Sequence, residues 1–196
     1  MDLFSADAAL PDIDHRPGWL AQGDADALFD ALHKGVPWEV HRIRMFGQMV
    51  DSPRLSCWMG DEDAAYRYSG TLFKPHPWPP ILREVCRRLE AECGGRFNSV
   101  LANLYRDGRD AMGWHRDDEP ELGDAPLIAS LSLGATRRFL LKGEDGVRHP
   151  IVLANGDLLL MSGDSQRRYR HGLPRTARPV GPRINLTFRN IHSAAR

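Results

Sequence analysis

The sequence predicts a mainly β protein of the α+β type, in which a double-sheet jelly-roll core follows an N-terminal extension that contains two helices. Three observations lead to this fold class. Short β-type runs separated by Gly, Pro, Asp and Asn recur from Phe97 onward. The segments between these runs are too short for helical crossovers, so the sheets should be mainly antiparallel and close as a jelly roll. Helical periodicity is confined to residues before Phe97.

The N-terminal part is expected to supply a flexible lead-in and two helices. Residues 1–20 are rich in Asp, Ala and Pro and show no periodicity, so they should be poorly ordered. Asp24 can cap a first helix, and Gly35 would end it in a left-handed conformation. The apolar positions of this helix share one face and are Ala25, Leu28, Phe29 and Leu32. A second helix should run from about Pro79 to Cys93 and end at Gly94.

The β-type runs then follow in chain order. They are SVLANLY, LIASLSL, RRFLLK, HPIVL, DLLLMS and RINLTF. Together with the helices that support them, they should form one domain over residues 21–196. The length of 196 residues, with 42% apolar and 27% charged residues, suits one such soluble domain.

Composition narrows the cellular setting and the partners. No apolar run is long enough to span a membrane, so a cytoplasmic protein without a membrane partner is expected. Cys57, Cys86 and Cys93 form an odd set without C-x-x-C spacing, which favours reduced packing residues over disulfides or a zinc site. The net charge of zero argues against a broadly basic surface, so any nucleic-acid footprint must be local. Clusters of arginine that could supply one lie between residues 42 and 54 and between residues 167 and 183.

A metal site is suggested by two residues within Gly113–Glu119. His115 and Asp117 are two apart, so on an extended segment their side chains point to the same face. With a third ligand they would form the 2-His-1-carboxylate set of non-haem Fe(II) oxygenases, and His171 is the candidate. By itself an H-x-D triplet is more often a chance occurrence or a surface ion pair.

The last β-type run carries a polar face and an apolar face. Ile184, Leu186 and Phe188 alternate with the polar residues, which are Arg183, Asn185, Thr187 and Arg189. Two guanidinium groups without an acid suit a small dicarboxylate held by charge-assisted hydrogen bonds. A strand with one face in solvent would show the same alternation.

H-x-D, the distal His and R-x-N-x-T-x-R in this order and spacing resemble the AlkB family of oxidative demethylases. The resemblance runs from Asn103 to Arg189 and extends back to about Phe46. It implies a double-stranded β-helix, Fe(II) bound by His115, Asp117 and His171, and O2 as a cosubstrate. It also implies a 2-oxoglutarate site, which would be formed by Asn103, Tyr105, Arg183, Asn185, Thr187 and Arg189.

The same resemblance implies oxidative demethylation of N-alkylated bases in DNA, of the 1-methyladenine and 3-methylcytosine type. Formaldehyde is released while 2-oxoglutarate is converted to succinate and CO2. A nucleotide-recognition extension is expected at about residues 36–78 and the jelly-roll core at about 97–192. The residues expected to contact the nucleic acid are Met45, Phe46 and Gly47, as an intercalating finger, and Arg54, Tyr66, Tyr68, Ser69, Trp114, Asp118 and Glu119.

Two features depart from the family pattern, and other functions remain open. A lysine-rich stretch common after the distal His is absent here, where only Arg175 and Arg178 occur, and Tyr68 stands where phenylalanine is common. The DNA could be double- or single-stranded, and a monomer is expected. Alternatives are the same chemistry on RNA, a catalytically silent nucleic-acid-binding module, and hydroxylation of a free amino acid or other small molecule.

Overall fold

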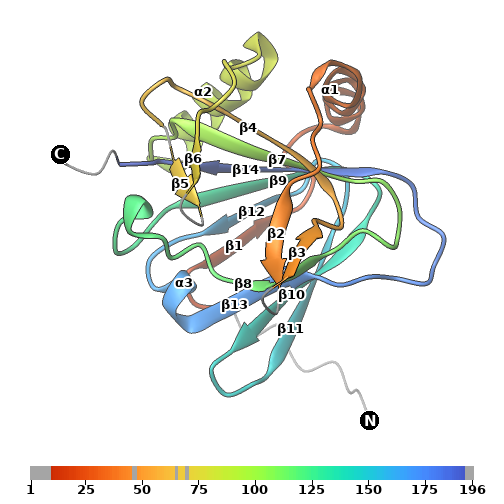
Figure 1. Ribbon diagram of the computed structural model, residues 1–196, viewed down its shortest axis with the longest axis vertical. Helices are drawn as coiled ribbons and strands as arrows, with labels where there is room; N and C mark the ends of the chain where they lie inside the picture. The colour runs from red at the N-terminus through yellow and green to blue at the C-terminus, as the bar shows by residue number, and fades with distance from the viewer. Residues whose placement is uncertain (1–9, 46–47, 65, 69–70, 193–196) are drawn as a thin grey trace.

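Two antiparallel sheets face each other in the computed structural model, which describes residues 10–45, 48–64, 66–68 and 71–192. The larger sheet has six strands in the order β1-β12-β9-β14-β7-β4, and the smaller has four in the order β11-β10-β13-β8 (Figure 1). Between β8 and β14 the chain passes back and forth between the two sheets, with β10 and β11 forming a hairpin within the smaller one. The predicted double-sheet jelly roll is therefore confirmed.

The strands of the larger sheet are β1 (Ile13–Arg16), β4 (Leu55–Gly60), β7 (Ser99–Tyr105), β9 (Ile128–Gly134), β12 (Leu158–Met161) and β14 (Arg183–Arg189). Those of the smaller sheet are β8 (Met112–His115), β10 (Arg137–Gly143), β11 (Arg148–Leu153) and β13 (Tyr169–Leu173). Two separate hairpins are formed by β2 (Arg42–Met45) with β3 (Gln48–Asp51) and by β5 (Tyr66–Tyr68) with β6 (Thr71–Phe73). The short helices η1 (Pro120–Leu122) and α3 (Ser165–Arg168) complete the elements.

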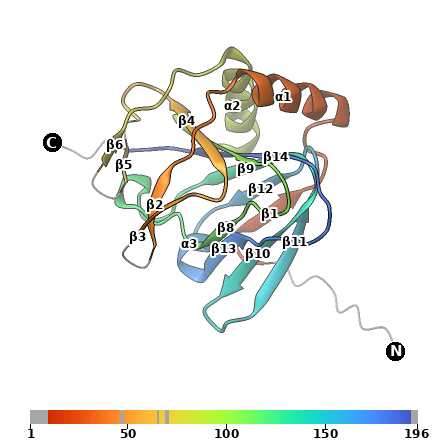
Figure 2. The same cartoon turned by 45° about the vertical axis from the view of Figure 1, so that its right-hand side comes forward.

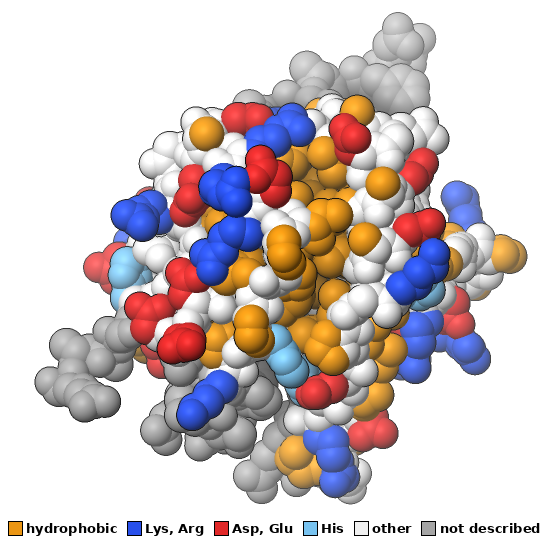
Figure 3. Space-filling view, turned by 90° about the horizontal axis from the view of Figure 1, so that it is seen from above, with side chains coloured by type: hydrophobic (Ala, Val, Ile, Leu, Met, Phe, Trp, Pro, Cys, Tyr) orange, Lys and Arg blue, Asp and Glu red, His pale blue; other side chains and the backbone are white. Residues whose placement is uncertain are grey.

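Helices α1 (Gln22–Gly35) and α2 (Pro80–Cys93) cover the outer face of the six-stranded sheet (Figure 2). Their buried apolar residues join the main core, where Leu28 of α1 and Leu89 of α2 belong to the same cluster as Phe188 of β14. Seen from this side, a strip of hydrophobic side chains is bordered by charged ones (Figure 3). No helix among the described residues is both long and apolar enough to cross a bilayer.

The second helix was predicted closely, whereas the ends of the first were not. Helix α2 has Pro at its start and Gly94 with φ 68° at its end, as expected. Helix α1 begins after Ala21 without a side-chain cap, so Asp24 lies in its first turn. Gly35 is its last helical residue and the chain continues extended at Val36, so the predicted left-handed stop is wrong.

The lead-in is a second correction. Residues 13–16 form β1, which pairs antiparallel with β12 at the edge of the larger sheet. Asp157 stabilises the position of this segment, because it accepts hydrogen bonds from the His15 ring and from the backbone N–H of Gly18. The segment is ordered by strand pairing with distant residues, which its polar composition does not reveal. Residues 1–9 lie outside the described part of the chain.

Strand β14 lies in the centre of the larger sheet, between β7 and β9. All seven of its residues are buried. Ile184, Leu186 and Phe188 face the helices and pack in the main core. Its polar face therefore points to the interior between the two sheets, which rules out a solvent-facing strand.

Candidate active site

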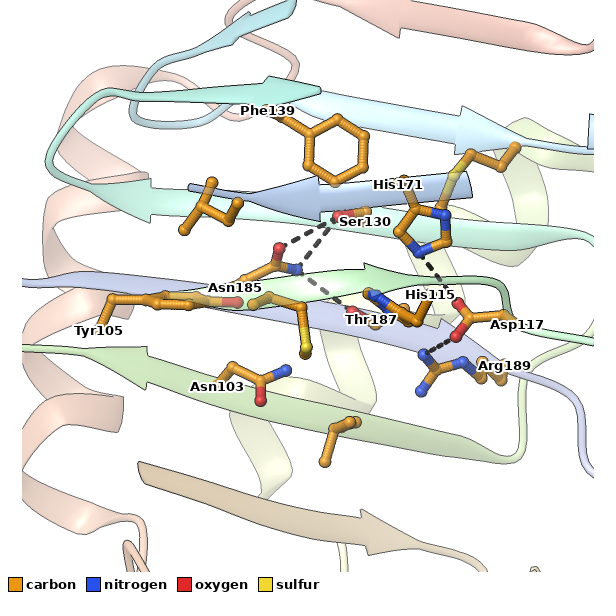
Figure 4. A pocket seen from close by; sticks show the side chains of 14 residues that line it. Asn103, Tyr105, His115, Asp117, Ser130, Phe139, His171, Asn185, Thr187 and Arg189 are labelled. Atoms are coloured by element: carbon orange, nitrogen blue, oxygen red, sulfur yellow. Dashed lines mark hydrogen bonds and ion pairs between the residues drawn. The ribbon is translucent and has the colours of Figure 1, made fainter. Parts of the chain in front are cut away.

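A pocket between the two sheets brings together polar residues of the larger sheet and histidines of the smaller one (Figure 4). Its polar lining consists of Asn103, Tyr105, His115, Asp117, Ser130, His171, Asn185, Thr187 and Arg189. Its apolar lining consists of Leu101, Met112, Phe139, Met161 and Leu173. Antiparallel pairing explains the convergence, because β14 sets its polar residues beside those of β7 and β9.

The three predicted metal ligands meet at one end of this pocket. His115 on β8 and His171 on β13 are direct cross-strand partners, with ring centroids 4.2 Å apart. Asp117 follows two residues after His115, and one ligand atom from each of the three residues lies within 4.8 Å of the others. The H-x-D spacing and the distal histidine thus form one cluster.

The protonation states suit a metal cation. The Nδ1 atom of His115 is 2.9 Å from the carbonyl oxygen of Gly113, which leaves its Nε2 for a ligand. Burial and the neighbouring His115 lower the pKa of His171 to about 3, so its ring is neutral. Although burial alone would favour the acid, the charge of Arg189 above all lowers the pKa of Asp117 to about 2. Neutral imidazoles and a carboxylate are the forms that bind metals.

Fe(II) fits this cluster on the chemistry of its donors. The Oδ2 atom of Asp117 is buried and has no hydrogen-bond partner among the described residues. It faces the Nε2 atom of His171 at 4.0 Å, and since this histidine is neutral the contact is not an ion pair. A buried carboxylate oxygen without a partner is costly, and a cation between these groups would relieve the cost. Two imidazoles and one carboxylate are typical of non-haem iron.

Asp117 is held from two sides by residues of other elements. Arg189, the last residue of β14, donates from Nη2 to Oδ1 of Asp117 at 2.8 Å. Gln166, in helix α3, accepts the backbone N–H of Asp117 at its Oε1 atom at 3.0 Å. Gln166 is only 4% exposed. Sequence analysis missed this residue, because only the folded chain brings α3 against the H-x-D segment.

Arg183 lies in the same interior and is incompletely paired. Its side chain donates from Nη2 to Ser132 at 2.9 Å and to Asn185 at 3.3 Å. Within the described chain its Nε and Nη1 atoms are buried without a partner. Burial lowers the pKa of Arg183 to about 10, so it stays charged at neutral pH. A buried guanidinium with two free N–H groups fits the carboxylate of 2-oxoglutarate.

The remaining polar groups form a network along β14. Asn185 donates from Nδ2 to Ser130 at 3.1 Å and to Thr187 at 3.3 Å (Figure 4). Asn103 of β7 accepts a hydrogen bond from the Nε atom of Arg54 at 2.7 Å. This contact turns the Nδ2 donor of Asn103 away from Arg54. The structure thus places Arg54, expected to touch nucleic acid, against Asn103, which was predicted to bind 2-oxoglutarate.

Three further residues of this region were missed. Ser130 accepts a hydrogen bond from Asn185, and Ser132 accepts one from Arg183. The sequence contained a pattern that could have identified them, since the two serines alternate with leucines in LIASLSL. Arg137 is 4% exposed and donates to the backbone carbonyls of Asp107, Asp110 and Pro174, behind Tyr105. Nothing in its sequence context distinguishes it from a surface arginine.

The predicted nucleic-acid contacts are only partly placed. Met45 ends β2, and Tyr66 and Tyr68 form the ends of β5, but the described structure does not extend to their side chains. The predictions for Phe46, Gly47 and Ser69 fall outside the described residues. Asp118 is exposed and Glu119 half-buried beyond the metal ligands. Trp114 is 41% exposed and is absent from the pocket lining, because it alternates with His115 along β8.

Comparisons with known proteins agree with this geometry. Residues 12–189 match the family model of the 2OG-Fe(II) oxygenase superfamily. The chain is 39% identical to alpha-ketoglutarate-dependent dioxygenase alkB homolog 3 of Homo sapiens over 90% of its length and 65% of that relative. It is 37% identical to DNA oxidative demethylase ALKBH2 of Homo sapiens over 87% of its length and 70% of that relative.

Solved structures show the same fold. The structure of OsALKBH1 aligns with a TM-score of 0.66 at 18% identity, over 92% of this chain and 99% of that one. A 2OG-Fe(II) oxygenase family protein from Burkholderia pseudomallei aligns with a TM-score of 0.62 at 19% identity, over 93% of this chain and 88% of that one. With the family model, the sequence identities and the pocket in agreement, the chain belongs to the AlkB family within the 2OG-Fe(II) oxygenase superfamily.

Proposed function

We propose that this protein is a DNA-repair dioxygenase that removes methyl groups from N-alkylated bases such as 1-methyladenine and 3-methylcytosine. One observation carries the proposal: the His115, Asp117 and His171 cluster shares the interior between the two sheets with the incompletely paired guanidinium of Arg183. The name of one relative, DNA oxidative demethylase ALKBH2, supports DNA as the substrate. The chain spans 65% of the length of alkB homolog 3 of Homo sapiens, Bos taurus and Mus musculus.

When bound, Fe(II), 2-oxoglutarate and O2 supply the oxidation that hydroxylates the N-methyl carbon, with succinate and CO2 formed from 2-oxoglutarate and formaldehyde released as the base is restored. The protein contributes binding and orientation. Arg183 offers two N–H groups to one carboxylate of 2-oxoglutarate. Arg189 lies at the metal ligand Asp117, so it would face the carboxylate nearer the metal.

The pocket also excludes water. Met112, Phe139, Met161 and Leu173 line it beside the histidines, and these side chains keep the reacting region apolar. A dry pocket strengthens the charge-assisted contacts of the arginines and limits side reactions. The target base must leave the duplex, or be presented in a single strand, to reach such an enclosed site.

Formaldehyde and succinate release tests the proposal. The purified protein is loaded with Fe(II) without oxygen and given O2, 2-oxoglutarate and oligonucleotides with one 1-methyladenine, as DNA or RNA and as single strand or duplex. Equal amounts of the two products from DNA, and none without 2-oxoglutarate, are expected. Turnover of the RNA oligonucleotides alone would show that the substrate is RNA and not DNA. Binding of oligonucleotides without either product would favour a silent nucleic-acid-binding module, and turnover of free amino acids or nucleosides alone would favour a small-molecule hydroxylase.

We also propose that the protein acts as a monomer, because residues from a single chain supply the metal cluster and the buried arginines. Light scattering at assay concentration checks this point. A dimer at that concentration would contradict it.

A further inference from the structure

The outer face of the four-stranded sheet carries a cluster of cations on three neighbouring strands. Lys142 of β10 is the direct cross-strand partner of Arg148 of β11 on one side and of Arg170 of β13 on the other. Strands lie about 4.8 Å apart, so the row of three cations is roughly 10 Å wide. Like charges directly opposite each other across strands destabilise a sheet. An anionic partner would relieve this repulsion.

Acidic residues do not neutralise this row. In the described part of the chain, no side-chain hydrogen bond or ion pair is made by Lys142, Arg148 or Arg170. The adjacent turn contains two acids: Glu144 lies 3.8 Å from Arg116, and Asp145 accepts the backbone N–H of Val147. Elsewhere in the same arginine-rich stretch, Arg167 is bound to Asp164 and Arg183 is buried between the two sheets. In a chain of zero net charge, the row is therefore a local excess of positive charge.

An exposed tryptophan belongs to the same cluster. The guanidinium carbon of Arg148 lies 5.8 Å from the centre of the Trp114 ring, although the two residues come from opposite edges of the sheet. Trp114 is 41% exposed, so part of its indole is accessible to an unpaired base. Cations that follow a backbone beside an aromatic ring that stacks on bases are typical of single-strand binding surfaces.

The position of the cluster connects it to the pocket. Trp114 precedes His115 on β8, and Arg170 precedes His171 on β13, so the cluster is on the reverse side of the wall that holds the two histidines. Strand β8 is the edge strand of its sheet. A chain that leaves the histidine side over this edge would meet Trp114 first and then the cations.

We propose that Trp114, Lys142, Arg148 and Arg170, the outer-face cluster, bind a single-stranded segment of the nucleic-acid substrate next to the target nucleotide. The cations hold successive phosphates, and the indole stacks on an unpaired base. A duplex would shield its bases from Trp114, which is why the cluster fits a single strand better. This inference rests on the nucleic-acid substrate proposed above.

Binding of an unmodified 20-nucleotide single strand to the metal-free protein tests the cluster without any turnover. The variant Lys142→Gln/Arg148→Gln/Arg170→Gln is compared with Lys34→Gln/Arg87→Gln/Arg96→Gln. The control removes the same charge from exposed sites on helices α1 and α2 and in the connection between α2 and β7. Fluorescence anisotropy gives the dissociation constant between 50 and 300 mM salt. Loss of three phosphate contacts should weaken binding by about 10-fold or more and reduce the slope of log Kd against log salt by about 2.

A second pair of variants tests the indole. Trp114→Leu should weaken single-strand binding about fivefold or more, while Trp114→Phe keeps a stacking ring and should lose less. Circular dichroism checks that each variant is folded.

Three outcomes would overturn the proposal. The cluster and control variants could show equal affinity and equal salt slope, or the cluster variant could lose more affinity for a duplex than for the single strand. In a parallel assay with vesicles of anionic phospholipid, the cluster variant could lose binding to the vesicles and keep its affinity for the single strand. Because no methylated base is present, failed demethylation leaves this measurement valid. Conversely, if the wild-type protein demethylates DNA and the cluster variant binds the single strand normally, the proposed function stands and only the role of the outer-face cluster is contradicted.

Discussion

Arg189 and Asp117 are joined by a buried hydrogen bond of 2.8 Å between Nη2 and Oδ1. The bond links the final residue of the strand that carries the cosubstrate arginines to the carboxylate of the metal cluster. Arg183, at the other end of the same strand, makes no contact of this kind and is bound to Ser132 and Asn185. The two arginines of R-x-N-x-T-x-R thus have different neighbours, so their substitution should have different effects on 2-oxoglutarate and metal binding.

Arg183→Gln should raise the KM for 2-oxoglutarate by about 10- to 100-fold, because a charge-assisted pair is lost. It should leave the absorption spectrum of Co(II) in the metal site unchanged. Arg189→Gln should raise the same KM and also alter the Co(II) spectrum, since Asp117 loses its hydrogen-bond donor. Steady-state kinetics and Co(II) titration measure both. Identical Co(II) spectra in the two variants would contradict the role assigned to Arg189.

Gln166→Met should weaken Co(II) binding by about 10- to 100-fold, as is common when the support of a metal ligand is removed. The side chain keeps its size but no longer accepts the backbone N–H of Asp117. Gln166→Glu retains an oxygen at this position and should bind Co(II) more tightly than Gln166→Met. Titration of the metal-free protein gives the affinities. Wild-type affinity in Gln166→Met would show that Asp117 is held adequately by Arg189 alone.

His115→Ala should abolish formaldehyde release while changing the free energy of unfolding of the metal-free protein by less than about 1 kcal/mol. The residue is half-buried on the edge strand β8 and outside the hydrophobic core clusters. Urea denaturation and the oligonucleotide assay measure the two effects. Turnover near the wild-type rate in this variant would remove His115 from the metal site.

Local patterns predicted which side chains of the H-x-D segment and of β14 share a face, whereas their assignment to a metal and to 2-oxoglutarate came from the family resemblance. The two-residue spacing of His115 and Asp117 and the alternation along β14 are properties of an extended chain, so they survive without knowledge of the fold. The same alternation could have predicted that Trp114 faces away from His115. The prediction that Trp114 contacts the substrate did not state on which face of the strand its side chain lies.

Contacts between distant segments could not be predicted in the same way. Gln166 supports Asp117 only because α3 packs against the end of β8, and β1 is a strand only because β12 lies beside it. Arg137 has the same residue type as exposed arginines, and its burial depends on two carbonyls of the loop between β7 and β8 and on a third that follows β13. Such residues have no local signal, since their role is defined by partners far away in sequence.

Alanine substitutions at two glycines with positive φ distinguish the cost of a steric clash from the cost of backbone strain. Gly156 has φ +84°, and a Cβ there would lie 2.2 Å from the carbonyl oxygen of Leu20. Gly146 has φ +82° but nothing within 4 Å of its Cβ position. Gly146→Ala should therefore cost only the conformational strain, about 1 to 2 kcal/mol.

Gly156→Ala adds a collision with backbone and displaces the hydrogen bond from Leu20 N–H to the Gly156 carbonyl, so we expect a loss of at least about 3 kcal/mol. Urea denaturation of the two variants gives the difference directly. Equal losses would mean that the segment around Leu20 moves freely away from the turn before β12. That result would contradict the close packing of the N-terminal segment against the larger sheet.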